Sequence, residues 1–78
     1  MRLSVRYFAS LRDAAGCDHE SIVHQGDAIS LYQRLAQQHR FTMPQSRIRL
    51  AVNGALVPWV QALGEGDEVV FLPPVSGG

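Results

Sequence analysis

The sequence of 78 residues predicts a single α+β domain, in which one main helix packs on one face of a mixed sheet of about five strands. Apolar and polar residues alternate over residues 2–7 and 47–53, which is the period of a half-buried strand. One apolar stripe at helical spacing, in residues 28–39, predicts an amphipathic helix. Residues 68–72 are apolar on both faces, which favours a central position in the sheet.

The chain opens with a predicted strand whose inward residues are Leu3, Val5 and Tyr7. Phe8 then breaks the alternation, because it adds a bulky apolar group to the polar face. A second strand is predicted over residues 19–24, where the alternation is weaker and leaves the register open.

Two helices are predicted, one short and one long. Ser10 and Asp13 have the spacing of a capping box and Gly16 supplies a stop, so residues 11–15 should form a short helix. Asp27 should cap the main helix. The apolar positions of that helix are Ala28, Leu31, Tyr32, Leu35, Ala36 and His39.

The second half of the chain predicts three strands joined by tight turns. The first covers residues 47–53, and Asn53-Gly54 then favours a two-residue hairpin turn, because its type I′ geometry needs positive φ at both positions. A return strand is predicted over residues 55–57. Residues 64–67 should form a tight turn before the final strand, 68–72.

Composition excludes several classes of function. A formal net charge of zero and a pI of about 6.8 give no electrostatic footprint for nucleic acid or an anionic membrane. No apolar run has the length of a membrane span or the flanks of a signal peptide, so we expect a cytoplasmic protein. Cys17 is the only cysteine, which excludes an internal disulfide and a cysteine-based metal site. All seven basic residues are arginine, so no side-chain amine is present for Schiff-base or acylation chemistry.

The histidines predict no metal site. His19 and His24 have opposite strand parity, and His39 belongs to the helix, so the three should not converge on one ion. Trp59 follows Pro58 in a stretch too short for a full helix, and we interpret it as a core aromatic or one that anchors its loop. The alternative is that Trp59 contacts a partner.

Residues 73–78 are predicted to form a flexible tail that protrudes from the domain. Pro73 and Pro74 stop the last strand, because neither can donate a ladder hydrogen bond. Val75 and Ser76 lead into Gly77-Gly78, a thin stretch of backbone with a free α-carboxylate that could enter a narrow channel. The alternative is a frayed end in which the two glycines have no role.

A partner-binding surface is predicted on the face of the sheet opposite the main helix. Phe8, Val70 and Leu72 share that face by parity and form one patch if the first and last strands are neighbours, with Leu56 as a candidate extension. Alternation places a cationic rim around it: Arg2, Arg6, Arg47 and Arg49. The alternative is that a loop covers the patch.

Five segments of the chain match one protein family. They are Tyr7-Phe8-Ala9, Leu11-Arg12-Asp13, Ala51-Val52-Asn53, Gly66-Asp67-Glu68-Val69 and the octet Phe71-Leu72-Pro73-Pro74-Val75-Ser76-Gly77-Gly78. With these segments the chain resembles the small, MoaD-type subunit of molybdopterin synthase, over essentially its whole length. The octet is the most specific part. The resemblance implies the ubiquitin-like β-grasp fold, which agrees with the predicted order of elements.

The resemblance also implies a mechanism centred on Gly77 and Gly78. An E1-like, MoeB-type activating enzyme would adenylate the Gly78 carboxylate with ATP and Mg, and the adenylate would be converted to a thiocarboxylate. The tail would then enter the large, MoaE-type subunit of a heterotetrameric synthase, where its sulfur builds the dithiolene of molybdopterin from cyclic pyranopterin monophosphate. Catalytic side chains would belong to these partners, and this chain would bind no cofactor. Partner contacts would come from Phe8, Leu56, Val70, Leu72, Pro73, Pro74, Val75 and Ser76.

Two alternatives stay open. A sulfur carrier of the thiamine pathway shares the fold and the tail chemistry, although its usual ending lacks this Pro-Pro-Val pattern. A ubiquitin-like modifier or pure interaction module would show isopeptide conjugates or would tolerate the loss of Gly78. The sequence leaves the sulfur source and any role of Cys17 undetermined.

Overall fold

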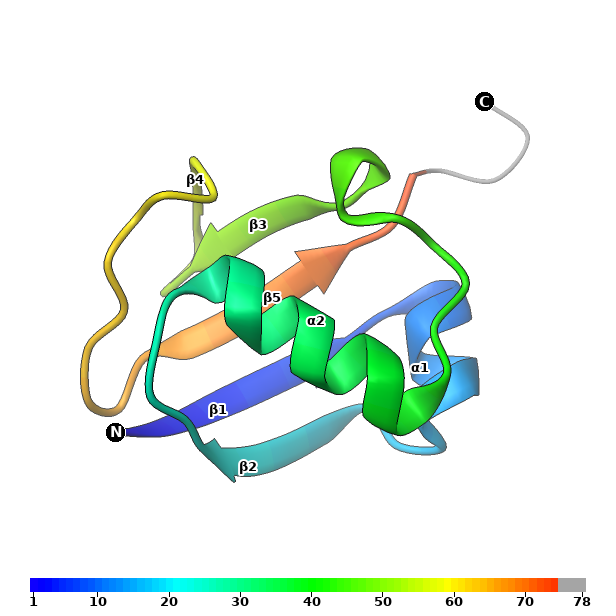
Figure 1. The fold of residues 1–78 in the computed structure, drawn as a ribbon, viewed down its shortest axis with the longest axis horizontal. Helices are drawn as coiled ribbons and strands as arrows, with labels where there is room; N and C mark the ends of the chain where they lie inside the picture. Colours follow the sequence, from blue (N-terminus) through cyan, green and yellow to red (C-terminus); the bar gives the residue numbers. More distant parts are fainter. Residues whose placement is uncertain (75–78) are drawn as a thin grey trace.

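The computed structural model describes residues 1–74, and residues 75–78 lie outside its description. The main helix, α2, crosses one face of a five-stranded mixed sheet, as Figure 1 shows. The elements in chain order are β1 (Arg2–Tyr7), α1 (Ala9–Ala15), β2 (His19–Val23), α2 (Ala28–His39), the 3₁₀ helix η1 (Gln45–Arg47), β3 (Arg49–Val52), β4 (Ala55–Val57) and β5 (Glu68–Leu72). The predicted α+β architecture is confirmed.

Strand β5 lies at the centre of the sheet, whose strand order is β2-β1-β5-β3-β4. It pairs in parallel with β1 and antiparallel with β3. Val69 and Phe71 face α2 and are fully buried, and Val70 on the other face is 8% exposed. The apolar composition of both faces of this strand therefore predicted its position correctly.

The core lies between α2 and the sheet. The helix begins where Asp27 accepts a 2.8 Å hydrogen bond from the Ser30 amide, as its sequence predicted. Four of the six residues of the predicted apolar stripe are buried; Ala36 and His39 are only partly buried. The buried residues that meet across this layer include Leu3, Val5, Tyr7, Leu31, Leu35, Leu50, Val69 and Phe71.

The short helix α1 begins earlier than predicted, and the proposed capping box is wrong. Its N-cap is Phe8, which makes no side-chain capping bond, and Ala9 reverses the chain with a φ of 50°. The Phe8 carbonyl accepts from the Leu11 amide at 3.1 Å, so the first helical turn starts directly after β1. Gly16 ends the helix in the left-handed conformation, as expected.

Strand β3 begins later than predicted because the preceding residues form η1. The Arg47 amide donates to the Pro44 carbonyl, and the Ile48 amide donates to the Gln45 carbonyl, both at 3.0 Å. These local bonds define a 3₁₀ turn, so Arg47 lies before β3 and strand alternation does not fix its direction; its place in the cationic rim stays a prediction. Asn53-Gly54 forms the predicted hairpin turn, with φ values of 52° and 86°.

Candidate functional site

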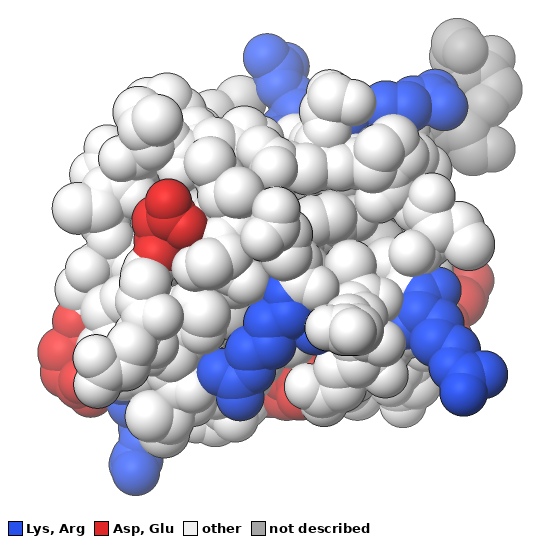
Figure 2. All heavy atoms as spheres, viewed as in Figure 1, with Lys and Arg blue, Asp and Glu red and all other residues white. Residues whose placement is uncertain are grey.

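Charge is scattered over the face of the molecule that carries α2. Figure 2 shows isolated arginine and acidic side chains on this face, separated by uncharged surface. Among residues 1–74, no helix has the length and apolar character needed to cross a membrane. The face of the sheet opposite α2, which we call the outer face, carries the residues of the predicted partner-binding surface.

The outer face carries a continuous row of residues across four strands. The strand registers place Arg6 beside Val70, Val70 beside Ala51, and Ala51 beside Leu56. Leu56, at the end of this row, is 60% exposed. The β1–β5 pairing confirms the neighbour relationship on which the predicted patch depended.

A second group of apolar residues lies at one end of the outer face. Leu72 is half-buried and lies opposite Arg49 on β3. Phe8 follows Tyr7, whose β5 partner is Phe71, so Phe8 and Leu72 leave the β1–β5 ladder at the same end. Phe8 is 43% exposed.

We call Phe8, Leu56 and Leu72 the outer-face patch. Val70 shares their face as predicted, but Arg6 and Ala51 flank it and leave it buried. Val70 therefore lies on the same face as the patch but contributes little accessible surface to it.

The cationic rim of the patch differs in detail from the prediction. Arg6 lies 3.3 Å from Glu68, and both side chains are about half-exposed, so this ion pair contributes little to stability. Arg2 and Arg49 are exposed strand residues on the same face. The rim is thus less positive than the sequence alone suggested, because one of its arginines is neutralised by a neighbour on β5.

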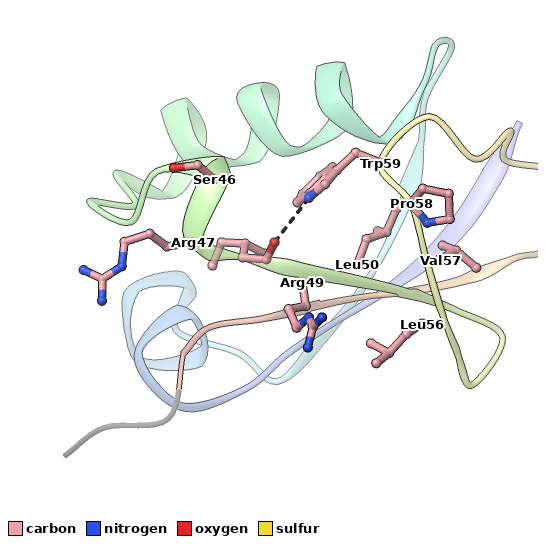
Figure 3. Close-up of a pocket in the computed structure, with 9 residues that line it drawn as sticks. Ser46, Arg47, Arg49, Leu50, Leu56, Val57, Pro58 and Trp59 are labelled. Atoms are coloured by element: carbon pink, nitrogen blue, oxygen red, sulfur yellow. Dashed lines mark hydrogen bonds between the residues drawn. The ribbon is translucent and has the colours of Figure 1, made fainter. Parts of the chain in front are cut away.

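A groove of about 470 Å³ opens beside the patch, at the edge of the sheet (Figure 3). The β3–β4 ladder ends at the pair Leu50 and Val57, because Pro58 has no amide to continue it. One position further on, the indole Nε1–H of Trp59 donates to the Ile48 carbonyl at 3.2 Å. The groove lies where the two segments separate.

Trp59 lines the groove and also packs against the core. Its ring stacks on Phe71, with centroids 5.8 Å apart, and meets Tyr32 edge to face. The interpretation of Trp59 as an aromatic that anchors its turn is confirmed. Sequence reasoning missed the groove itself, which depends on the register between segments distant in sequence.

Each of the three histidines has its own side-chain partner. Ring nitrogens of His19, His24 and His39 lie 2.7–3.0 Å from side-chain oxygens of Ser4, Ser30 and Glu20, respectively. His19 is exposed on the outer face and His24 is buried toward α2, as their parity predicted. Residues 1–74 contain no cluster of three side chains suited to hold a metal ion.

Glu20 contacts both Tyr7 and His39, an arrangement that the sequence did not predict. Glu20 lies in β2 opposite Val5 of β1 and therefore faces α2. There it accepts a 2.5 Å hydrogen bond from the Tyr7 hydroxyl. Burial, followed by this bond, raises the pKa of Tyr7 well above its ordinary value of 10.0. Tyr7, Glu20 and His39 lie together on the helix side of the sheet, away from the outer-face patch. Glu20 gives the polar groups of the other two a hydrogen-bond partner.

The predicted tail begins next to the outer-face patch. Pro73 is half-buried and Pro74 is exposed, directly after β5. Val75, Ser76, Gly77 and Gly78, which include the predicted reactive end, lie outside the described residues. Any segment that continues from Pro74 starts on the strand that carries Leu72.

The chain matches known proteins along its whole length. The model of the ThiS family matches residues 5–78. A molybdopterin synthase sulfur carrier subunit of Mycobacterium tuberculosis is 37% identical over 84 aligned positions, which cover 100% of this chain and 99% of that protein. The subunit of the same name from Escherichia coli is 32% identical and covers 97% of this chain and 99% of its own.

Solved structures agree with this match. SAMP1 of Haloferax volcanii superposes with a TM-score of 0.79 at 26% identity, covering both chains completely. A chain in the complex of subunits 1 and 2 of the molybdopterin-converting factor from Helicobacter pylori has a TM-score of 0.72 at 25% identity, also with full coverage of both. The likeness confirms the ubiquitin-like β-grasp fold that the sequence resemblance implied.

Proposed function

Because this chain belongs to the ThiS family and functions as a molybdopterin synthase sulfur carrier subunit in molybdenum cofactor biosynthesis, we propose that the Gly78 carboxylate carries the sulfur. The observation that most directly supports this proposal is the extent of the family match, which includes both Gly77 and Gly78. The side chains offer few alternatives, since the sequence contains no lysine and a single cysteine, Cys17.

The proposed chemistry solves the problem that a carboxylate is a poor electrophile. An oxygen of the Gly78 carboxylate attacks the α-phosphorus of Mg-ATP on an E1-like activating enzyme, and pyrophosphate leaves. Hydrosulfide, HS⁻, released by a sulfur donor, then attacks the acyl carbon and expels AMP. The product is a thiocarboxylate, which is ionised near neutral pH and presents a nucleophilic sulfur. The large synthase subunit would receive this end and pass its sulfur to cyclic pyranopterin monophosphate.

The outer-face patch is the proposed docking surface for both partners. Phe8 and Leu56 are exposed, and Leu72 lies on the strand that leads into the tail. A partner that covers this patch would bury apolar surface and would also be close to the segment beyond Pro74. We therefore propose that the activating enzyme and the large subunit compete for it. The large subunit would assemble with this chain as a heterotetramer.

Mass spectrometry tests the proposal directly. The protein, incubated with its activating enzyme, Mg-ATP and a sulfur donor, should gain the mass of one sulfur minus one oxygen, and tandem fragmentation should place this change on Gly78. Deletion of Gly78 should abolish the gain while the circular dichroism spectrum stays unchanged. A persulfide on Cys17, or no mass change with a competent activating enzyme, would show that the thiocarboxylate mechanism is wrong.

The same experiment distinguishes the alternatives. A carrier of this pathway should transfer sulfur to cyclic pyranopterin monophosphate when the large subunit is added, whereas a thiamine-pathway carrier should not. A modifier should appear joined to lysines of other proteins. Because the sequence contains no lysine, such conjugates cannot be lysine-linked chains of this protein alone.

A further inference from the structure

The groove at the sheet edge is lined by both apolar residues and arginines. It is lined by Ser46, Arg47, Ile48, Arg49, Leu50, Leu56, Val57, Pro58 and Trp59. Among the described residues that line it, two arginines are charged and none is acidic. Figure 3 shows the Trp59 indole turned toward the Ile48 carbonyl, with Arg47 and Arg49 carried by the segment on the other side of this bond.

The two arginines are available to a partner. Both are exposed, and neither forms a salt bridge with a residue in the described range 1–74. Arg6 differs, because Glu68 already pairs with it. A guanidinium presents several N–H donors in a fixed plane, which suits a carboxylate that accepts two of them.

The groove combines apolar and polar surface in similar measure. Ile48 and Leu50 are buried, Trp59 is half-buried, and Leu56 is exposed at the margin. A volume of about 470 Å³ can hold a large side chain together with some backbone. A small inorganic anion would satisfy the arginines but would leave this apolar surface in contact with water.

The position of the groove favours an extended chain. Within the described residues, β4 pairs with β3 alone and forms the outer edge of the sheet. Edge strands can accept the backbone of another protein. Leu56 belongs to both the groove and the outer-face patch, so a protein docked on the patch would reach the groove without a gap. This last step alone rests on the proposed function.

We infer that the groove binds an extended segment of a partner protein, in which an apolar side chain is flanked by carboxylates. The apolar side chain packs against Trp59 and Leu56, and the carboxylates bind Arg47 and Arg49. Charge complementarity then selects acidic segments and disfavours basic ones.

Trp59 provides a direct readout, because it is the only tryptophan in the sequence. The probes are two synthetic peptides, acetyl-Asp-Phe-Asp-Leu-Asp-amide and its counterpart with lysine in place of each aspartate. The acidic peptide should shift the indole N–H resonance saturably, with an affinity that falls as salt is added. The basic peptide and sodium phosphate should leave this resonance in place. Equal shifts with both peptides, no shift with either, or the same shift with phosphate alone would overturn the inference.

Variants separate the groove from its surroundings. Arg47→Glu should weaken binding of the acidic peptide about tenfold, and Ser46→Phe should block the groove sterically at an exposed position. Arg40→Glu, which makes the same charge change at the end of α2, is the matched control and should bind normally. An equal loss in Arg40→Glu would show that only overall charge matters. Loss of Gly78 should leave peptide binding intact, so failure of the sulfur mechanism and failure of this inference are distinguishable.

Discussion

Asn53 and Asp67 join two turns of the chain through a 2.9 Å hydrogen bond from Asn53 Nδ2 to Asp67 Oδ1. Asn53 Oδ1 also accepts from the Glu68 amide at 2.9 Å, and the Asn53 amide donates to the Glu68 carbonyl at 2.8 Å. Asp67 in turn accepts from the Gly64 amide at 2.7 Å. One asparagine therefore connects the β3–β4 hairpin to the turn that begins β5.

Substitution of Asn53 should reveal the value of this connection. Asn53→Ala removes two side-chain hydrogen bonds and places an alanine at a φ of 52°, so we expect a loss of about 2–4 kcal/mol in the free energy of unfolding. Asn53→Gly loses the same bonds but tolerates this φ, and it should cost less. Urea denaturation measures both. An unfolding midpoint of Asn53→Ala equal to that of the wild type would contradict the prediction.

Stability should fall in acid because of two aspartates. The Ser30 amide bound to Asp27 and the Asn53 amide group bound to Asp67 hold the pKa of each carboxyl below its ordinary value of 3.8. The ionised forms are therefore favoured in the folded state. Their contribution is complete above pH 3.8 and is lost as the pH falls through the lowered pKa values.

The combined variant Asp27→Asn, Asp67→Asn tests this pH dependence. Asparagine can still cap the helix and accept hydrogen bonds, but it does not titrate in this range. Urea midpoints measured from about pH 5 down to about pH 2 should therefore fall less steeply in the variant. If the urea midpoints of the wild type and the variant fell equally steeply with pH, the two aspartates would not be the cause of the acid sensitivity.

Leu72→Arg should weaken docking without unfolding the protein. Leu72 is a half-buried residue of the outer-face patch, so arginine can extend into solvent from that position. We expect a loss of about 1–3 kcal/mol in the affinity for both the activating enzyme and the large subunit, measured by calorimetry. Val23→Arg is the control, since Val23 is an exposed apolar residue of β2, at the far edge of the sheet. Unchanged affinity of Leu72→Arg for both partners would exclude this docking surface.

Glu20 should stabilise the fold through the Tyr7 hydroxyl. Glu20→Ala leaves that buried hydroxyl without its acceptor, at a cost of about 1–3 kcal/mol. Tyr7→Phe removes the hydroxyl as well and should make the loss of Glu20 less costly. A double-mutant cycle measured by urea unfolding reports this coupling. Strictly additive effects would mean that the bond contributes no net stability.

Gly77→Ala should slow sulfur loading without affecting the melting temperature. Gly77 is outside the predicted core, whereas a methyl group there would obstruct a narrow channel in the activating enzyme. Gly64→Ala is the control, because its added Cβ would lie an ordinary 3.7 Å from Asp67 Oδ2. The rate of thiocarboxylate formation should fall only in Gly77→Ala. Normal rates with bulky residues at both 77 and 78 would show that the glycines are incidental.

Local sequence patterns predicted most of the fold. The Asn53-Gly54 turn, the Asp27 cap and the two-faced strand 68–72 each depend on a few neighbouring residues, and each is confirmed. The predicted start of β3 at residue 47 was wrong, because Arg47 and Ile48 continue the strand-like alternation although they precede the strand. The Pro44 carbonyl accepts the Arg47 amide, and this local bond overrides the alternation.

The site was predictable where it followed strand parity. Phe8 and Leu72 share a face and an end of the sheet, which parity indicated once β1 and β5 were assumed to be neighbours. Glu20 and the groove depend on long-range register. Nothing near Glu20 in sequence identifies Tyr7 as its partner, and nothing near Trp59 shows that its indole reaches Ile48.

The central position of β5 has a consequence for folding during synthesis on the ribosome. In the described sheet, the β1–β2 and β3–β4 pairs are joined to each other only through β5, which follows both in the chain. A nascent chain can form either pair early, but the two halves can unite only once β5 has been made. Until then, β1 and β3 each have one unpaired edge, open to aggregation or chaperones. An activating enzyme that recognises the assembled outer face would therefore not bind chains in which β5 is missing. Such chains would not be adenylated, and no ATP would be consumed on them.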